Sequence, residues 1–234
     1  MNRITLIQNY INKYNYNNYL EIGVHKGLSF LSINCRNKRA VDPFFQIDFW
    51  TKAKWYFKLP NNWRNKYFEI TSDDFFKKPV KNLKKDSKLD IVFIDGLHTF
   101  KGSLNDVLNS LQYLNNDGVI ILHDCFPPNK AAATPASSYK EVEQLNIEGW
   151  NGLWCGDVWK TIKYLKMQYP ESLDVFVLNA DFGLGNVKVK TREKLDLNIN
   201  IDLFNEINKL DYNYLVSSPD IIIGLQDDLD LNNF

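Results

Sequence analysis

The stretch YLEIGVHKGLS, residues 19–29, runs from an apolar segment through a loop with two glycines into a segment with helical character. Its first part, Tyr19–Val24, is apolar and partly β-branched, which is typical of a buried strand. Gly23 ends that strand, and glycine at such a position lets the backbone turn and approach a ligand closely. Gly27 keeps the start of the next helix uncrowded. The stretch therefore predicts a strand, a ligand-binding turn and a helix in direct succession.

The same alternation of strand and helix continues along the chain. Four further strand-like runs are Arg39–Val41, Tyr67–Ile70, Asp90–Ile94 and Val119–Leu122. The helix-length segments are Lys26–Cys35, Phe44–Asn65, Asp73–Leu83 and Phe100–Leu114. Nearly continuous apolar strands that alternate with helices indicate a parallel sheet covered on both faces. Between the last of these helices and strands we expect a polar turn over Asn115–Gly118, with Gly118 at positive φ.

The second half of the chain predicts a different arrangement. Asp157 is a candidate N-cap for a helix that continues to Tyr169. Leu173–Leu178 and Gly185–Lys190 predict an antiparallel pair around a short turn. The fold class that we expect is α/β, a Rossmann-like and mostly parallel sheet of seven strands with helices on both faces and an antiparallel final strand.

The length of 234 residues suits one domain with additions. We expect this domain over residues 1–190 and a C-terminal extension over 191–234, with a helix near Leu203–Leu210. Residues 125–156 contain Pro, Ala and Trp residues, and their apolar residues do not recur at the spacing of a helix or a strand. We therefore interpret them as a lid inserted after a strand end.

Charge and cysteine content limit the classes of partner and the compartment. The 28 Lys and Arg residues balance 28 Asp and Glu residues, so no excess positive charge favours a nucleic-acid partner. The first 19 residues lack the pattern of a signal peptide, and no apolar run has membrane-spanning length. Three cysteines without metal-ligand spacing favour a reduced, cytoplasmic protein. We therefore expect neither a nucleic-acid nor a membrane partner.

Acidic residues near the glycine loop predict a nucleoside cofactor. The loop has the spacing G-x-x-x-G and lacks the G-x-G-x-x-G of a dinucleotide site. Glu21 precedes it, and its carboxylate is a candidate partner for a cationic amino group. Asp42 ends the second strand and is a candidate acceptor for both hydroxyls of a ribose. This combination does not name the cofactor. His25 lies in the loop and receives no catalytic role.

Two histidines and two aspartates follow neighbouring strands. Asp95 and His98 come after the fourth strand, and His123 and Asp124 after the fifth. The carboxyl ends of parallel strands form the ligand-binding edge of such a sheet, so we expect these four residues to converge. Either His98 or His123 then serves as a base oriented by Asp124. Alternatively, Asp95 and Asp124 bind a divalent cation that activates an acceptor hydroxyl.

The chain resembles the class I S-adenosylmethionine (SAM) methyltransferases in the order and spacing of four features. These are residues 19–29, Asp42, the run IDGLHTF at 94–100 and the run GVIILHD at 118–124. The branch with the greatest resemblance contains the macrocin-type sugar O-methyltransferases. The resemblance implies O-methylation of a small molecule such as a sugar. It also implies a set of cofactor-binding residues: Glu21, Gly23, Val24, Gly27, Ser29, Asp42, Ser72, Asp73 and Asp95. Of these, the resemblance places Ser72 and Asp73 beside the adenine.

The resemblance leaves the metal and the acceptor open. Members of the family that use Mg²⁺ place two acidic or amide residues where this chain has His123 and Asp124, and histidine is a softer ligand than Mg²⁺ prefers. A homodimer is a candidate assembly. The alternative functions are a nicotinamide-dependent oxidoreductase and a non-catalytic nucleoside-binding module.

Overall fold

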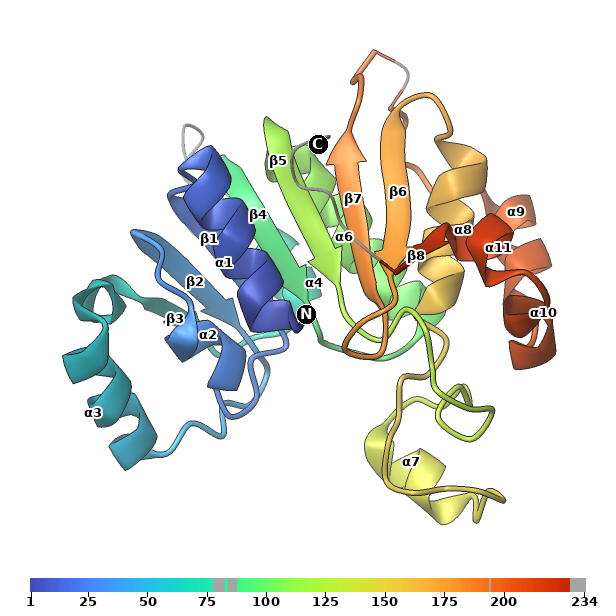
Figure 1. Ribbon diagram of the computed structural model, residues 1–234, viewed down its shortest axis with the longest axis horizontal. Helices are drawn as coiled ribbons and strands as arrows, with labels where there is room; N and C mark the ends of the chain where they lie inside the picture. The colour runs from blue at the N-terminus through green and yellow to red at the C-terminus, as the bar shows by residue number, and fades with distance from the viewer. Residues whose placement is uncertain (78–82, 84–87, 194, 228–234) are drawn as a thin grey trace. The chain divides into compact units, whose positions relative to one another are not determined.

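The structure is a computed structural model that describes residues 1–77, 83, 88–193 and 195–227 (Figure 1). Its strands form one sheet in the order β3-β2-β1-β4-β5-β7-β6-β8. The strands are β1 (Asn18–Ile22), β2 (Asn37–Val41), β3 (Lys66–Phe68), β4 (Leu89–Ile94), β5 (Leu114–Leu122), β6 (Leu173–Leu178), β7 (Leu184–Val189) and β8 (Leu225–Gln226).

Helices connect most of the strands. They are α1 (Arg3–Tyr14), α2 (Leu28–Ser32), α3 (Phe49–Lys58), the 3-10 helix η1 (Pro60–Arg64), α4 (Ser72–Lys77), α6 (Phe100–Tyr113), α7 (Tyr139–Gln144), α8 (Trp159–Gln168), α9 (Ile201–Asn208), α10 (Tyr212–Ser217) and α11 (Pro219–Ile223).

The predicted fold class is confirmed. β1 pairs in parallel with β2 and β4, and β2 pairs in parallel with β3. The predicted antiparallel pair is β6 with β7. The described residues contain eight strands rather than seven, because the two-residue strand β8 pairs in parallel with β6. A strand of two residues in a polar tail has too short a pattern to be recognised in the sequence.

The chain divides into two compact units. The first unit contains residues 1–96 and 105–121, and the second contains residues 97–104 and 122–234. In the first unit, α1 contacts β4 and buries Leu6 and Ile7. The Asn2 side chain caps α1 by accepting a hydrogen bond from the Thr5 N–H. In the second unit, α8 packs on β6 and is contacted in turn by α9 and α11 (Figure 1).

The predicted turn at Asn115–Gly118 is wrong, because β5 begins directly after α6, at Leu114. The Asn115 side chain bonds to Asp90, and the Tyr16 hydroxyl bonds to the Asp117 carbonyl, so these polar residues are tied to neighbouring elements. Gly118 is not among the residues with positive φ. Glycine is favoured there by a close approach, since a Cβ would lie 2.9 Å from the Asp90 carbonyl oxygen.

Three predicted helices differ from the observed ones. The segment Phe44–Asn65 contains α3 and η1, which begins at Pro60, where the missing N–H suits a new helix start. Asp157 does not cap α8, because its carboxylate accepts a hydrogen bond from the Phe100 N–H at 2.6 Å. The segment Asp73–Leu83 contains α4, and most of its later part lies outside the described residues.

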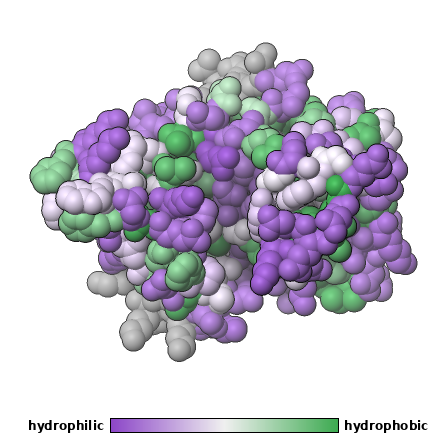
Figure 2. All heavy atoms as spheres, turned by 90° about the horizontal axis from the view of Figure 1, so that it is seen from below, coloured by the Kyte–Doolittle hydropathy of each residue, from purple (hydrophilic) through white to green (hydrophobic). Residues whose placement is uncertain are grey.

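Figure 2 shows one face of the molecule, on which hydrophilic and hydrophobic side chains are interspersed. Among the helices that the structure describes, none combines the length and the apolar character needed to cross a membrane.

Candidate cofactor and catalytic site

The glycine loop joins the ends of three strands of the first unit. The Gly23 N–H donates to the Val41 carbonyl at 2.9 Å, and the Asp95 N–H donates to the Ile22 carbonyl at 2.8 Å. Gly23 has φ +83°, a conformation that L-residues rarely adopt. A Cβ at Gly23 would lie 2.0 Å from the Asp95 carbonyl oxygen. Glycine is therefore required here because the ends of β1 and β4 approach each other closely.

The rest of the loop is fixed by backbone contacts. The Gly27 N–H donates to the Val24 carbonyl at 2.8 Å, which closes the turn before α2. His25 Nε2 lies 3.0 Å from Gln46 Oε1, and the Gln46 N–H donates to the His25 carbonyl. His25 thus contributes to the shape of the loop. Ser29 lies in the first turn of α2 and is half-buried.

Asp42 follows β2, and its carboxylate anchors the glycine loop. Its Oδ2 accepts hydrogen bonds from the N–H groups of Val24 and His25, at 2.8 Å each. Its Oδ1 accepts one from the Phe44 N–H at 2.7 Å. A carboxylate has about four acceptor positions, so these bonds leave one for a ribose hydroxyl. The residue fits a nucleoside through one further hydrogen bond, whereas two are expected from the sequence.

Glu21 has a different environment from the one expected. Its side chain is 1% exposed, and the Tyr19 hydroxyl donates to Oε2. Burial raises the pKa of Glu21 to about 8, and burial lowers the pKa of the neighbouring Lys38 to about 7. Glu21 is therefore a core residue of the first unit, and its contact with a cationic amino group stays a prediction.

Ser72 and Asp73 begin α4, at the place predicted to border adenine. Ser72 is hydrogen-bonded to Asp106, a buried carboxyl on α6. Burial raises the pKa of Asp106 to about 7, the Ser72 hydrogen bond lowers it, and the nearby Asp73 raises it. A Cβ on Gly96 would lie 3.7 Å from Asp106 Oδ2, so this carboxyl lies near the end of β4. Asp106 thus adds a polar group beside the predicted adenine position.

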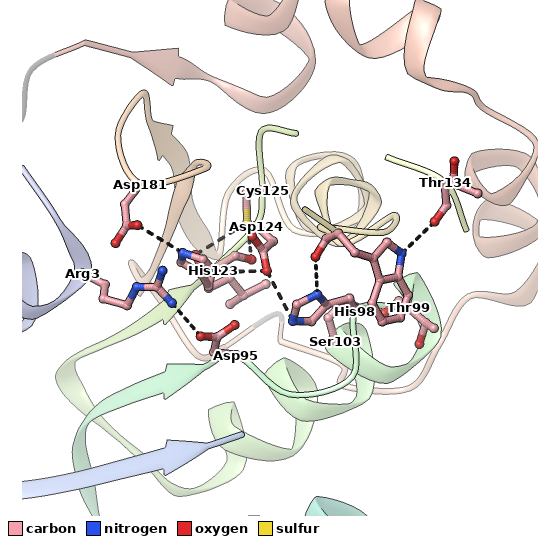
Figure 3. A network of polar contacts seen from close by, with 12 residues as sticks. Arg3, Asp95, His98, Thr99, Ser103, His123, Asp124, Cys125, Thr134 and Asp181 are labelled. Atoms are coloured by element: carbon pink, nitrogen blue, oxygen red, sulfur yellow. Dashed lines mark hydrogen bonds and ion pairs between the residues drawn. The ribbon is translucent and has the colours of Figure 1, made fainter. Parts of the chain in front are cut away.

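Asp95 has a cationic partner in the first unit. Arg3 Nη1, at the start of α1, donates to Asp95 Oδ2 at 2.8 Å (Figure 3). Both side chains are mostly buried, and an ion pair of this kind is favourable when it is well hydrogen-bonded. Any cation that binds to Asp95 must therefore share this carboxylate with Arg3.

His98 belongs to the second unit, and a backbone carbonyl orients its ring. His98 Nδ1 lies 2.8 Å from the Trp154 carbonyl oxygen (Figure 3). A carbonyl oxygen only accepts, so this contact assigns the proton of the neutral ring to Nδ1. Nε2 is then the basic nitrogen, and it lies 3.3 Å from Asp124 Oδ2. The carboxylate stabilises the imidazolium that forms when Nε2 takes a proton.

A single carboxylate oxygen connects the two histidines. Asp124 Oδ2 lies 3.3 Å from His98 Nε2 and 3.0 Å from His123 Nδ1. Asp124 has φ +62°, a strained backbone conformation for this residue type. On the other side of the ring, His123 Nε2 lies 3.6 Å from Asp181 Oδ1 (Figure 3). The four side chains form a chain of alternating imidazoles and carboxylates, which we call the histidine relay.

The predicted lid contributes to the histidine relay through its backbone. Trp154 supplies the carbonyl that orients His98, and its indole Nε1 donates to the Thr134 carbonyl at 2.9 Å. The Trp154 ring also lies against the His98 ring, with centroids 5.1 Å apart. The N–H of Cys155 donates to the Ala132 carbonyl at 2.9 Å. The lid segment that orients His98 is therefore itself held in place by hydrogen bonds to the carbonyls of Thr134 and Ala132.

The structure brings together His98, His123 and Asp124, as the sequence predicts. Asp95 belongs to the first unit and Asp124 to the second. Their joint binding of a cation therefore stays a prediction.

Sequence reasoning missed three residues, namely Arg3, Asp106 and Asp181. Asp181 lies in the turn between β6 and β7, where an Asp is expected for its turn-forming tendency alone. Arg3 lies in a polar N-terminal segment, far from its partner in the sequence. Asp106 follows the helical pattern of α6, and its burial is the only feature that sets it apart. None of these residues carried a local signal for its contact.

Comparisons with known proteins agree with this fold. Residues 20–125 match the sequence model of a family described as a methyltransferase domain. The chain is similar to the SAH-bound methyltransferase PaMTH1 from Podospora anserina, with 18% identity, a TM-score of 0.56, and coverage of 81% of this chain and 78% of that one. It is also similar to an O-methyltransferase from Bacillus cereus in complex with SAH, with 13% identity, a TM-score of 0.54 and 80% coverage of each chain.

A third similar structure is the O-methyltransferase TomG from Streptomyces achromogenes, in complex with SAM. The identity is 10%, the TM-score 0.56, and the coverage 81% of this chain and 80% of that one. No curated protein matches the chain. Similarity at these identities shows the fold, and the match to the methyltransferase-domain model covers residues 20–125. The predicted extent of the domain, residues 1–190, stays a prediction.

Proposed function

We propose that this protein is a SAM-dependent O-methyltransferase that acts on a hydroxyl group of a small molecule. The observation that carries the proposal is the match of residues 20–125 to a methyltransferase domain, which includes the glycine loop, Asp42, His98 and Asp124. The loop fits the group because Asp42 retains one acceptor position. The similar structures with SAH or SAM support the same cofactor.

The proposed cofactor residues of the first unit hold the nucleoside. Gly23 and Gly27 border the methionine part, with Val24 and Ser29 in the same loop, and Asp42 accepts a ribose hydroxyl. Ser72 and Asp73 border the adenine, and Asp95 lies near the methionine end. When bound, SAM supplies an electrophilic methyl group.

The proposed base is His98. Its Nε2 would take the proton of the acceptor hydroxyl, so that the oxygen could accept the methyl group that bound SAM would supply. The Trp154 carbonyl keeps the ring in the reactive tautomer, and Asp124 stabilises the imidazolium. His123, held between Asp124 and Asp181, orients Asp124. In this proposal His123 positions another residue and does not itself take the proton.

We propose that the positive charge beside Asp95 comes from Arg3 and that no divalent cation is required. Arg3 donates directly to Asp95, so a metal would have to displace or share this contact. The alternative, Mg²⁺ held by Asp95 and Asp124, predicts activity that is lost on chelation and restored by Mg²⁺.

The acceptor is proposed to be a hydroxyl compound such as a sugar. The lid supplies aromatic residues suited to stacking on a sugar ring, including Tyr139 and Trp150, whose rings lie 5.9 Å apart. A homodimer stays a prediction that light scattering can test.

The test begins with calorimetric titration of the purified protein with S-adenosylhomocysteine (SAH) and with NAD. We expect binding of SAH and not of NAD, and the reverse would favour an oxidoreductase. Transfer of labelled methyl groups from SAM to a panel of sugars and other hydroxyl compounds then tests turnover. His98→Gln should abolish transfer and preserve SAH affinity, because His98 is the proposed base and is not among the proposed cofactor residues. Transfer at the normal rate in His98→Gln would refute the assigned base.

A further inference from the structure

Helix α3, in the first unit, carries exposed aromatic and basic side chains on one side. Residues four apart in an α-helix lie in one row along its surface. One row of α3 contains Phe49 and Phe57, and the adjacent row contains Trp50, Lys54 and Lys58. All five side chains are exposed. We call this surface the α3 face.

The exposure of the aromatic side chains is large. Phe49, Trp50 and Phe57 are 72%, 78% and 84% exposed, and no residue of α3 is buried. With about 150–250 Å² for each aromatic side chain, these three expose on the order of 400 Å². Figure 2 shows green and near-white side chains at the left end of the view, where α3 lies. An exposed apolar patch of this size marks an interaction surface.

The charges beside this patch are mostly positive. Residues 48–64 contain three lysines, one arginine and one acidic residue, Asp48, whose carboxylate caps the start of α3 by accepting a hydrogen bond from the Thr51 N–H. Lys52 lies on another side of the helix, with Nζ 4.2 Å from the centroid of the Tyr67 ring. Lys54 and Lys58 are the cations of the α3 face. Their apolar stems extend the aromatic surface, and the Lys58 ammonium lies 4.7 Å from the centroid of the Trp55 ring.

We propose that the α3 face docks on the surface of a bilayer that contains anionic lipids. Phe49, Trp50 and Phe57 enter the headgroup region, where aromatic side chains are favoured. Lys54 and Lys58 contact the lipid phosphates, and their charge makes binding depend on anionic lipid and on salt. The helix lies along the surface and does not span the bilayer.

A second copy of the chain fits this face less well. In a symmetric contact, each copy would place its lysines near those of the other copy, and Asp48, the one carboxylate of residues 48–64, already caps the start of α3. The sequence expectation of no membrane partner rested on the overall charge balance and on the lack of a long apolar run. Neither property reports the charge of one helix face.

The test is co-sedimentation of the full chain with vesicles of phosphatidylcholine, either alone or mixed with phosphatidylglycerol. The variants are Trp50→Ala/Phe57→Ala and Lys54→Gln/Lys58→Gln. The matched controls are Ile221→Ala, which alters a side chain that is 72% exposed on α11, and Lys101→Gln/Lys140→Gln, which removes two exposed lysines elsewhere. Circular dichroism and SAH titration confirm that each variant is folded.

We expect binding to the mixed vesicles, little binding to phosphatidylcholine alone, and release at high salt. Each lysine contributes about a fivefold factor in affinity, so the double lysine variant should bind roughly twentyfold more weakly. The aromatic variant should lose at least about tenfold, and the controls should bind as the unchanged protein does. Equal binding by all variants, or no binding to either vesicle, would overturn the proposal. Sedimentation velocity would assign the α3 face to a second copy instead if the unchanged protein is a dimer that does not bind lipid and the aromatic variant is a monomer.

Discussion

Gly23→Ala adds one methyl group where the ends of β1 and β4 meet. The new Cβ would lie 2.0 Å from the Asp95 carbonyl oxygen, whereas real Cβ contacts are essentially never below 3.0 Å. The backbone must therefore move by about 1 Å, which costs about 1–3 kcal/mol in a well-packed region. The left-handed conformation at φ +83° costs a non-glycine residue roughly 1–2 kcal/mol more. We expect the free energy of unfolding to fall by about 2–5 kcal/mol.

Gly149→Ala is the matched control, because Gly149 has φ +78° and no atom lies within 4 Å of the added Cβ. This variant should lose only the conformational part, roughly 1–2 kcal/mol. Urea unfolding measures both free energies, and calorimetric titration measures SAH affinity. The movement at Gly23 shifts the loop that Asp42 anchors, so Gly23→Ala should bind SAH at least about tenfold more weakly. Gly149→Ala should bind it normally. Equal losses of stability in the two variants, with unchanged SAH affinity in both, would refute the reasoning.

The remaining predictions concern pH, the histidine relay and metal. Burial raises the pKa of Glu21 from 4.5 to about 8, so between these pH values the folded protein holds a proton that the unfolded chain releases. The free energy of unfolding, measured with urea, should therefore fall as pH rises through this window. In Glu21→Gln this dependence on pH should be weaker. Asp181→Asn removes a carboxylate that holds His123 beside Asp124, so turnover should fall about tenfold, while the exposed control Asp220→Asn leaves turnover unchanged. Chelation with EDTA should not change turnover, because Arg3 supplies the positive charge at Asp95; loss of turnover that Mg²⁺ restores would contradict this.

The parallel part of the fold could be predicted because its strands have a strong local pattern. β1 and β4 are buried on nearly every residue and form largely apolar runs in the sequence. β2 is buried to the same extent but includes Lys38 and Arg39, so only its end is apolar. The start of β5 could not be predicted in this way. Asn115 and Asp117 read as turn residues, but their partners, Asp90 and Tyr16, are distant in the sequence. Polar residues that are paired within a sheet look the same in a sequence as polar residues in a loop.

The site residues also differ in whether the local sequence predicts their contacts. His123 and Asp124 follow one strand and His98 another, so strand ends alone were sufficient to predict that they meet. The contacts that refine their roles come from the Trp154 carbonyl and from Asp181. A backbone carbonyl carries no sequence signature, and a turn aspartate has a common local explanation. The burial of Glu21 could not be predicted either, because a carboxyl beside a glycine loop has the same sequence pattern whether it is buried or exposed.

The histidine relay also bears on whether the protein is an enzyme or a binding module. Removal of two carboxylates and two imidazoles from water is costly unless they are well paired, and Asp124 adds a strained backbone conformation. Nucleoside binding needs the glycine loop and Asp42 and gains nothing from this cost. A base that must take a proton at Nε2 needs a fixed tautomer and a nearby carboxylate, and His98 has both. The arrangement therefore favours methyl transfer over binding alone, because only a proton-transfer step uses the groups whose burial opposes folding.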